Sequence, residues 1–214
     1  MSPEEKEAEE KEKSRHDRFE ASCGLIIAVL AAALAITDIG SGRYGDDELI
    51  ANSRRASDFQ WYQSKSVKGN LAESERDLLS ALLTAQVIQP DARPAIEKRM
   101  TALTEAAERY DQEKKEILLG SAAVGEENWV QDIDGEMGKL VGAVQWEARA
   151  AHLESVGDIF DFATFFLQIS LVMGAVALLV DAERLQILFR RILVGLGVIG
   201  SALSVMAFLS AMVG

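Results

Sequence analysis

The residues best suited to chemistry form one run, Trp61–Lys68. On a helix, Trp61, Lys65 and Lys68 share one face, which places an aromatic ring beside two ammonium groups. Such a face can bind an anion or a partner, with the lysines as charge and the ring as platform. Alternatively, the rings fill a helical bundle while the lysines extend outward; we favour this structural interpretation. The candidate patch comprises Trp61, Tyr62, Gln63, Lys65, Ser66 and Lys68.

A second motif, Gly195–Gly200, matches the dinucleotide fingerprint Gly-x-Gly-x-x-Gly. That fingerprint requires a preceding strand and a helix N-terminus with free amides. Here it lies inside an uncharged apolar stretch, where helix amides bond to one another. We interpret it as helix packing, because small residues four apart let another helix approach closely. The predicted packing positions are Gly24, Ala28 and Ala32 near the N-terminus, and Gly197, Gly200, Ser201 and Ser204 near the C-terminus.

Other reactive constellations are missing from the sequence. His16 and His152 have no ligand partners at metal-binding spacing, and Cys23 is the single cysteine. No nucleophile elbow or phosphate loop occurs. The apolar stretches contain no Asp, Glu, Lys, Arg or His that would mark a proton or ion path. We therefore expect no enzyme, no catalytic residue, no cofactor and no bound metal.

The distribution of charge indicates how these residues are positioned. The 214 residues include 34 acidic and 22 basic ones, yet the stretches 21–37, 162–180 and 192–213 contain none of them. The rest of the chain is charged at more than one residue in three, above the quarter typical of globular proteins. This segregation excludes a single compact soluble globule. It predicts an all-α integral membrane protein with three transmembrane helices in a lipid bilayer.

The spans are expected at 19–39, 159–180 and 192–213, since a helix needs about 20 apolar residues to cross a bilayer. The first is short enough to resemble a signal peptide, with Ala33–Ala35 as a cleavage site. The long acidic segment before it favours an uncleaved span. Residues 1–18 are expected to form a charged cytoplasmic tail, either disordered or a frayed helix, and we favour a solvated tail.

Orientation follows from Lys and Arg in the short flanks. Five basic residues precede the first span, and the expected loop 181–191 carries Arg184, Arg190 and Arg191. With three spans these segments lie on the same side. We therefore expect a multi-pass protein of the bacterial inner (cytoplasmic) membrane. Its N-terminus is cytoplasmic, and residues 40–158 and the C-terminus are extracytoplasmic.

The segment 40–158 is predicted to form a helical domain without strands. A flexible joint at Gly40–Gly45 precedes helices at about 46–87, 95–119 and 127–152, with a proline turn between the first two. The second helix has a heptad seam, and the first offers a partner stripe, so we expect an antiparallel coiled-coil hairpin. The seam is Ile96, Met100, Leu103, Ala107, Tyr110, Lys114 and Ile117, and the partner stripe is Leu71, Leu78, Leu82 and Ala85.

The predicted third helix carries its own apolar stripe. Its members are Val130, Ile133, Met137, Leu140, Val144 and Ala148. The stripe can pack against the hairpin or form a binding groove, and we favour packing.

The run Arg18–Glu20 before a short Ala-rich span, followed by Trp61–Lys68, resembles a bacterial membrane family known only as a domain of unknown function. The resemblance covers about 15–88 and the general character of 158–191, whereas the Gly-rich region 120–145 departs from it. It implies a three-span helical protein with a helical loop, and no activity.

Together these features favour a non-enzymatic, self-associating scaffold or partner-binding module with a helical extracytoplasmic domain. We expect a homo-oligomer, leave open an unidentified protein partner, and expect no nucleic acid. The alternative is a subunit of an oligomeric channel or passive pore lined by the serine face of the third span. An enzyme ranks third.

Overall fold

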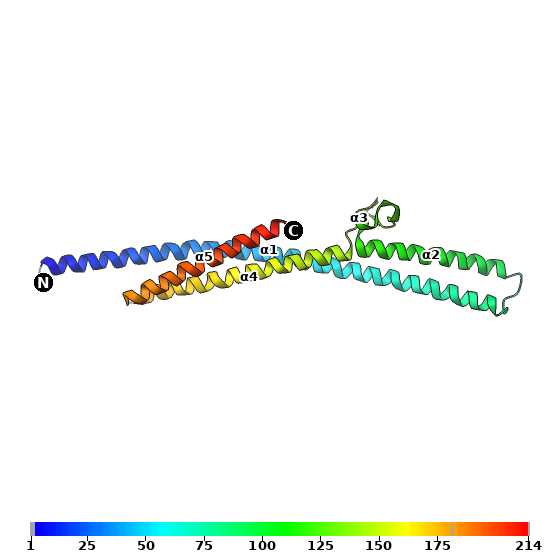
Figure 1. The fold of residues 1–214 in the computed structure, drawn as a ribbon, viewed down its shortest axis with the longest axis horizontal. Helices are drawn as coiled ribbons and strands as arrows, with labels where there is room; N and C mark the ends of the chain where they lie inside the picture. The colour runs from blue at the N-terminus through cyan, green and yellow to red at the C-terminus, as the bar shows by residue number, and fades with distance from the viewer. Residues whose placement is uncertain (1–2, 181, 214) are drawn as a thin grey trace. The chain divides into compact units, whose positions relative to one another are not determined.

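The computed structural model describes residues 3–180 and 182–213, and most of them are helical (Figure 1). The elements in chain order are α1 (Pro3–Thr84), α2 (Arg93–Leu119), α3 (Ser121–Val124), the 3-10 helix η1 (Glu126–Asn128), β1 (Asp132–Ile133), β2 (Glu136–Met137), α4 (Ala143–Leu179) and α5 (Glu183–Val213). The all-α class is confirmed. Three of the described helices, α1, α4 and α5, are long and apolar enough to cross a membrane.

The chain divides into two compact units. We call the residues up to Asp47, together with those from His152 onward, the apolar unit. Glu48–Ala151 form the polar unit. Each unit has its own packing, described separately below.

Helix α1 joins the predicted span 19–39 and the predicted helix 46–87 into one helix, which begins earlier, at Pro3, and ends at Thr84. Residues 3–18, expected as a solvated tail, are helical, and residues 1–2 of that tail lie outside the described residues. The sequence there is rich in Glu and Lys, which are good helix formers. Oppositely charged Glu and Lys side chains four residues apart also stabilise a helix. The joint predicted at Gly40–Gly45 is also wrong, because helix α1 continues through it.

In the apolar unit, α1, α4 and α5 lie side by side (Figure 1). One cluster of buried side chains joins Leu30, Leu167 and Leu193 from the three helices. A second cluster joins Val156, Phe160 and Ala207 and is extended by Tyr44 and Phe208. The predicted span 192–213 falls within α5, and 159–180 falls within α4 except for its last residue.

The basic loop predicted at 181–191 is wrong, because α5 begins at Glu183. Its three arginines therefore stand on the first turns of a helix; residue 181 lies outside the described residues. An acidic residue in the first turn stabilises a helix N-terminus. The Gln186 side chain also donates to the Val180 carbonyl at 2.7 Å, which satisfies a carbonyl just after α4. These interactions explain why the connection is so short.

In the polar unit, α2 returns beside α1 (Figure 1). The guanidinium of Arg99 donates to both carboxylate oxygens of Glu75, at 3.0 and 3.1 Å. Pro94 stands in the first turn of α2, as predicted. All seven residues of the predicted seam of α2 are at least partly buried, and Ile117 is completely buried.

The stripe predicted to face that seam from α1 is wrong. Leu71 and Leu78 are 66% and 60% exposed. A different face of α1 pairs with α2 at Lys65 and with Glu147 of α4 at Arg55. It repeats at spacings of four and three, and its members are partly or fully buried: Ala51, Arg55, Asp58, Tyr62, Lys65, Gly69, Ala72, Arg76, Leu79 and Leu83. Gly69 lies 3.6 Å from the Tyr110 side chain, measured from the position of a Cβ. The small residues Gly69 and Ala72 thus let the two backbones approach, which the leucine stripe would prevent.

The predicted third helix at 127–152 is also wrong over its first half, since α4 begins at Ala143. Residues 120–142 form α3, η1 and a two-stranded antiparallel hairpin in which Asp132 pairs with Met137. Asp134 and Gly135 connect the strands with φ of 55° and 85°. Positive φ at both loop positions is the requirement of a type I′ turn, which Asp-Gly satisfies. The predicted apolar stripe is dispersed, with Met137 50% and Val144 44% exposed.

Candidate functional site

Within the candidate patch, Lys65 forms a buried ion pair with α2. Its ammonium lies 2.6 Å from Oε2 of Glu113, and the two side chains are 15% and 3% exposed. Arg109 donates its Nε–H to Oε1 of the same carboxylate at 2.8 Å. The Lys65 ammonium also lies 5.8 Å from the centroid of the Tyr110 ring. One buried carboxylate of α2 thus binds two cations, Lys65 from α1 and Arg109 from α2 itself.

These cations control the ionisation of Glu113. Burial raises the pKa of this carboxyl, but hydrogen bonds from Lys65 and Arg109 outweigh burial, and the net pKa is lowered. Glu113 is therefore ionised at neutral pH, and its charge is neutralised within the chain. Burial has the opposite net effect at Asp58, whose pKa is raised although Arg54 lowers it.

The other patch residues do not converge on Lys65. Gln63 and Lys68 are exposed, whereas Trp61, Tyr62 and Ser66 are partly buried. Trp61, Lys65 and Lys68 therefore do not form the single face that was predicted, because Lys65 contacts Glu113 and Lys68 remains in solvent. In the structural interpretation both lysines extend outward; Lys68 does so, whereas Lys65 is turned inward.

A second buried carboxylate, Glu116, organises residues 120–142. It is completely buried, and its Oε2 accepts the backbone N–H groups of Val130 and Gln131, each at 2.8 Å. Its Oε1 accepts the hydroxyl of Ser121 at 2.7 Å. The same hydroxyl oxygen accepts the N–H of Leu140 at 3.0 Å. Glu116 and Ser121 thus attach three separate points of this segment to α2.

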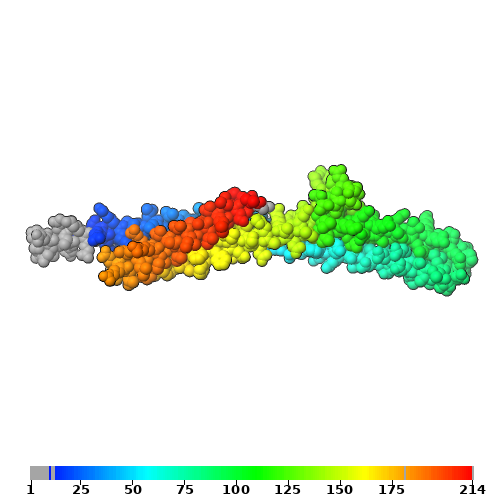
Figure 2. Space-filling model, in the orientation of Figure 1, coloured from blue at the N-terminus to red at the C-terminus, as the bar shows by residue number. Residues whose placement is uncertain are grey.

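Two glycine contacts complete this attachment. A side chain at Gly142 would overlap the backbone of Gly120, so the two ends of the segment lie in close contact. Gly138, with φ of 83°, lies under the Trp129 ring, whose Nε1–H donates to the Ser121 carbonyl at 2.8 Å. Figure 2 shows the segment standing out from the surface of α2. It is a fixed protrusion that presents side chains to solvent.

The predicted packing residues of the apolar unit fall into two groups. Gly197 and Gly200 are buried, and a Cβ at Gly200 would lie 2.8 Å from Leu167. The Ser204 hydroxyl shares a hydrogen bond of 2.8 Å with the Thr37 hydroxyl, and Ser201 is partly buried. These positions hold the three helices of one chain together. By contrast, Gly24, Ala28 and Ala32 are all exposed.

Glu113 and Glu116 are the functional residues that were missed. In the sequence they resemble the neighbouring acids Glu105 and Glu108, which are exposed. A weak signal was present, since Glu113 precedes the seam residue Lys114 and Glu116 precedes Ile117. Among the described residues, no group of three His, Cys, Asp or Glu could hold a metal ion.

A protein-family model described as Domain of unknown function (DUF4337) matches residues 19–210. The match includes the region 120–145, which departs from the resemblance noted in the sequence. No curated protein and no solved structure matches the chain. The chain belongs to the DUF4337 family.

Proposed function

We propose that this member of the DUF4337 family is a non-enzymatic, self-associating membrane scaffold. In this proposal α1, α4 and α5 cross the bacterial inner membrane, and the polar unit is a coiled-coil hairpin on the extracytoplasmic side. The basic residues that precede the apolar stretches of α1 and α5 remain in the cytoplasm. They include Arg15, Arg18 and the three arginines of α5.

One observation carries the proposal, an exposed apolar stripe on α1. Val67, Leu71 and Leu78 are 67%, 66% and 60% exposed, and Leu82 is 37% exposed. At 100° per residue these four side chains fall within about 60° of one another, on the face turned away from α2. Heptad-like spacing on an uncovered helix face is typical of a second coiled-coil interface.

The size of the stripe suits a second copy of the chain. Burying one Val or Leu side chain contributes about 1.5–3 kcal/mol. Two copies pairing through this stripe would bury eight such side chains, each between 37% and 67% exposed, which contributes on the order of 7–14 kcal/mol before costs. Association itself costs on the order of 4–15 kcal/mol. The two terms are of similar size, and restriction of both copies to one membrane lowers the cost and favours a dimer.

The apolar unit offers a matching surface. Gly24, Ala28 and Ala32 lie four residues apart on an exposed face of α1. Small residues at this spacing let two helices approach closely in lipid. An interface at this position would continue the pairing of the two copies within the membrane.

The carboxylates support a scaffold over an enzyme. Glu113 is neutralised by two cations, and Glu116 accepts three hydrogen bonds. A general acid or base must exchange protons with a substrate, whereas these groups are buried and occupied within the chain. The pore alternative requires Ser201 and Ser204 to face water, but Ser204 is 7% exposed and bonded to Thr37. We therefore do not put forward a pore.

The test is disulfide cross-linking in native membranes. In a Cys23→Ser background, Leu71→Cys should give a discrete dimer on mild oxidation. Asn70→Cys is the matched control, because it is exposed on the same helix about 100° from the stripe. Equal cross-linking of both variants, or none at either, would contradict the proposal.

A second test introduces negative charge into the exposed stripe of α1 and measures the oligomeric state. Leu71→Glu with Leu78→Glu should leave helicity intact and convert the oligomer to monomer in neutral detergent, as measured by light scattering. Asn70→Glu should leave the oligomer in place.

A further inference from the structure

A basic cleft lies between α1 and α5 in the apolar unit. Its volume is about 420 Å³. Both helices enter their uncharged stretches just beyond it, at Ala21 and Ile192. Charged side chains from both helices line the cleft: Arg15, Arg18, Glu183 and Arg190.

The charge of the cleft is positive. Three guanidinium groups line it against one carboxylate, that of Glu183. The nearby carboxylate of Glu20 contacts Nε2 of His16 at 3.1 Å and is therefore engaged on α1 itself. The cleft thus offers more positive charge than its own acids neutralise.

Its floor is amphipathic. The guanidinium of Arg190 lies 5.8 Å from the centroid of the Phe19 ring, a stacking distance that orients the cation. Ser22 and Ile187 also line the cleft, one turn along each helix. A lining of both polar and apolar side chains matches a ligand that has a charged head and a hydrocarbon tail.

We propose that this cleft binds the phosphate group of an anionic phospholipid headgroup. Arginine presents parallel N–H donors that match a phosphate, and basic clefts between spanning helices bind anionic headgroups. The flanks of the spans place Arg18 and Arg190 at headgroup depth. The inference rests on the proposed membrane insertion but is independent of self-association.

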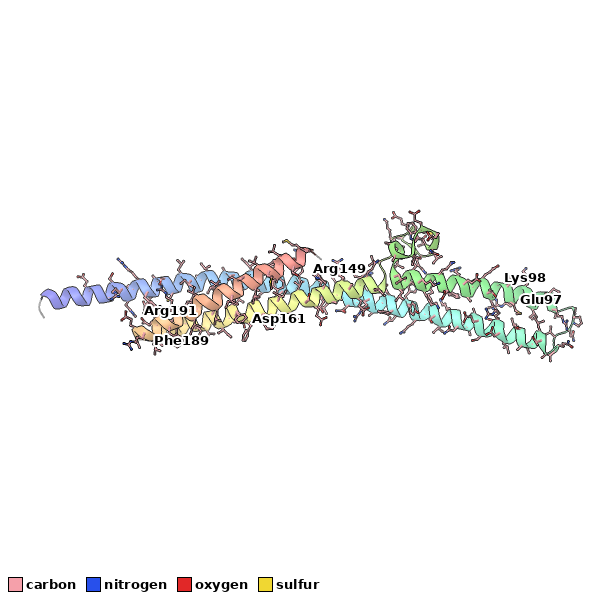
Figure 3. The ribbon with its side chains drawn as sticks, viewed as in Figure 1. Glu97, Lys98, Arg149, Asp161, Phe189 and Arg191 are labelled. Atoms are coloured by element: carbon pink, nitrogen blue, oxygen red, sulfur yellow. The ribbon has the colours of Figure 1, made fainter. Side chains whose placement is uncertain are left out.

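The experiment uses the full chain, purified in neutral detergent with equal amounts of phosphatidylglycerol and phosphatidylcholine. Native mass spectrometry counts the lipid retained. The wild type should retain phosphatidylglycerol in preference. Arg190→Gln should lower its affinity about five-fold. Arg191→Gln is the matched control, because it removes the same charge at the next residue, which does not line the cleft; Figure 3 shows Arg191 on the first turns of α5.

Each outcome decides the inference. Loss of selectivity in Arg190→Gln but not in Arg191→Gln supports it, provided that circular dichroism shows unchanged helicity. Equal loss in both variants overturns it, because general surface charge then explains binding. In a further arm, inorganic phosphate is added to the lipid-bound and to the lipid-free protein. If it displaces the lipid and also binds the lipid-free protein, the site is a site for free phosphate and the proposal of a lipid headgroup is contradicted. If Arg190→Gln fails to fold, Arg18→Gln replaces it.

A further arm separates this inference from self-association. The variant with Leu71→Glu and Leu78→Glu should be monomeric and still select phosphatidylglycerol. For the wild type, selectivity without dimers would contradict self-association alone, whereas dimers without selectivity would contradict the lipid site alone.

Discussion

Glu116 determines how residues 120–142 attach to α2. In Glu116→Gln, the amide nitrogen replaces one of the two acceptors, so either two backbone N–H groups or the Ser121 hydroxyl loses its partner. A buried donor left unpaired costs about 1–3 kcal/mol. We expect the free energy of unfolding to fall by at least this amount in urea titrations followed by Trp fluorescence. Glu126→Gln, at an exposed position of η1, should change it little; an equal effect would contradict this role of Glu116.

The pair Lys65–Glu113 predicts sensitivity to acid. The pKa of Glu113 is lowered below its ordinary value of 4.5, because Lys65 and Arg109 outweigh burial. Such a group adds stability above its unfolded pKa and loses that stability as the pH falls through its folded pKa. The free energy of unfolding should therefore decrease as the pH falls below about 4.5. In Glu113→Gln the decrease should be smaller, whereas the exposed Glu108→Gln should follow the wild type.

At these two carboxylates the sequence was insufficient for a physical reason. Whether an acid on α2 is solvated depends on what covers that part of the helix. Glu113 is bound by Lys65, which lies 48 positions earlier in the chain. Glu116 is bound by a segment that extends up to 15 positions later. Local spacing carries no information about either contact. Lys65 could be proposed as a site residue because its neighbours were aromatic and basic, but its partner could not.

At the scale of elements, the existence of the three apolar helices and of α2 was predictable, whereas the bounds of most helices and the pairing face of α1 were not. Helix α1 has two stripes with heptad spacing, one rich in Leu and one with small and charged residues. Hydrophobicity alone favoured the leucine stripe. The stripe with small and charged residues pairs with α2 instead, because Gly69 and Ala72 let the two backbones approach and Lys65 pairs with Glu113. The Asp134-Gly135 turn was readable as a hairpin signal, but the apolar spacing around it also fits a helix.

The turn-rich segment can be tested at Gly138. This residue has φ of 83° and lies against the Trp129 ring, so Gly138→Ala combines backbone strain with overlap. Strained positions of this kind cost on the order of 1–3 kcal/mol. We expect lower stability and altered Trp fluorescence. Gly45→Ala, inside α1 with nothing within 4 Å, should instead be neutral or stabilise by up to about 1 kcal/mol.

The packing of the three apolar helices gives a second element-scale prediction. Gly197 lies against Leu30 and Ser170, whereas Gly195 has nothing within 4 Å. Overpacking a close contact costs about 1–3 kcal/mol. Gly197→Val should therefore lower the temperature at which the purified protein aggregates in detergent, and Gly195→Val should not. Equal behaviour of the two variants would mean that α5 does not pack on α1 as described.

At the scale of the whole molecule, the segregation of charge already identified the three apolar helices, because three long stretches without a charged residue can be read directly from the sequence. The side of the membrane is a separate question. It depends on the arginines at the start of α5 and on the basic residues before the first span, which the proposal places in the cytoplasm. Figure 3 shows Arg191 on α5 and Glu97 on α2, both at exposed positions.

Cysteine labelling decides the orientation. In a Cys23→Ser background, Glu97→Cys should react with a membrane-impermeant maleimide in spheroplasts, because the polar unit is proposed to be extracytoplasmic. Arg191→Cys should react only after the membrane is opened, since it belongs to the cytoplasmic flank. The reverse pattern would invert the topology and place the lipid cleft in the outer leaflet. If both residues are labelled in intact spheroplasts, the arginines of α5 lie on the same side of the membrane as the polar unit. That result would contradict the three-span arrangement on which the scaffold proposal depends.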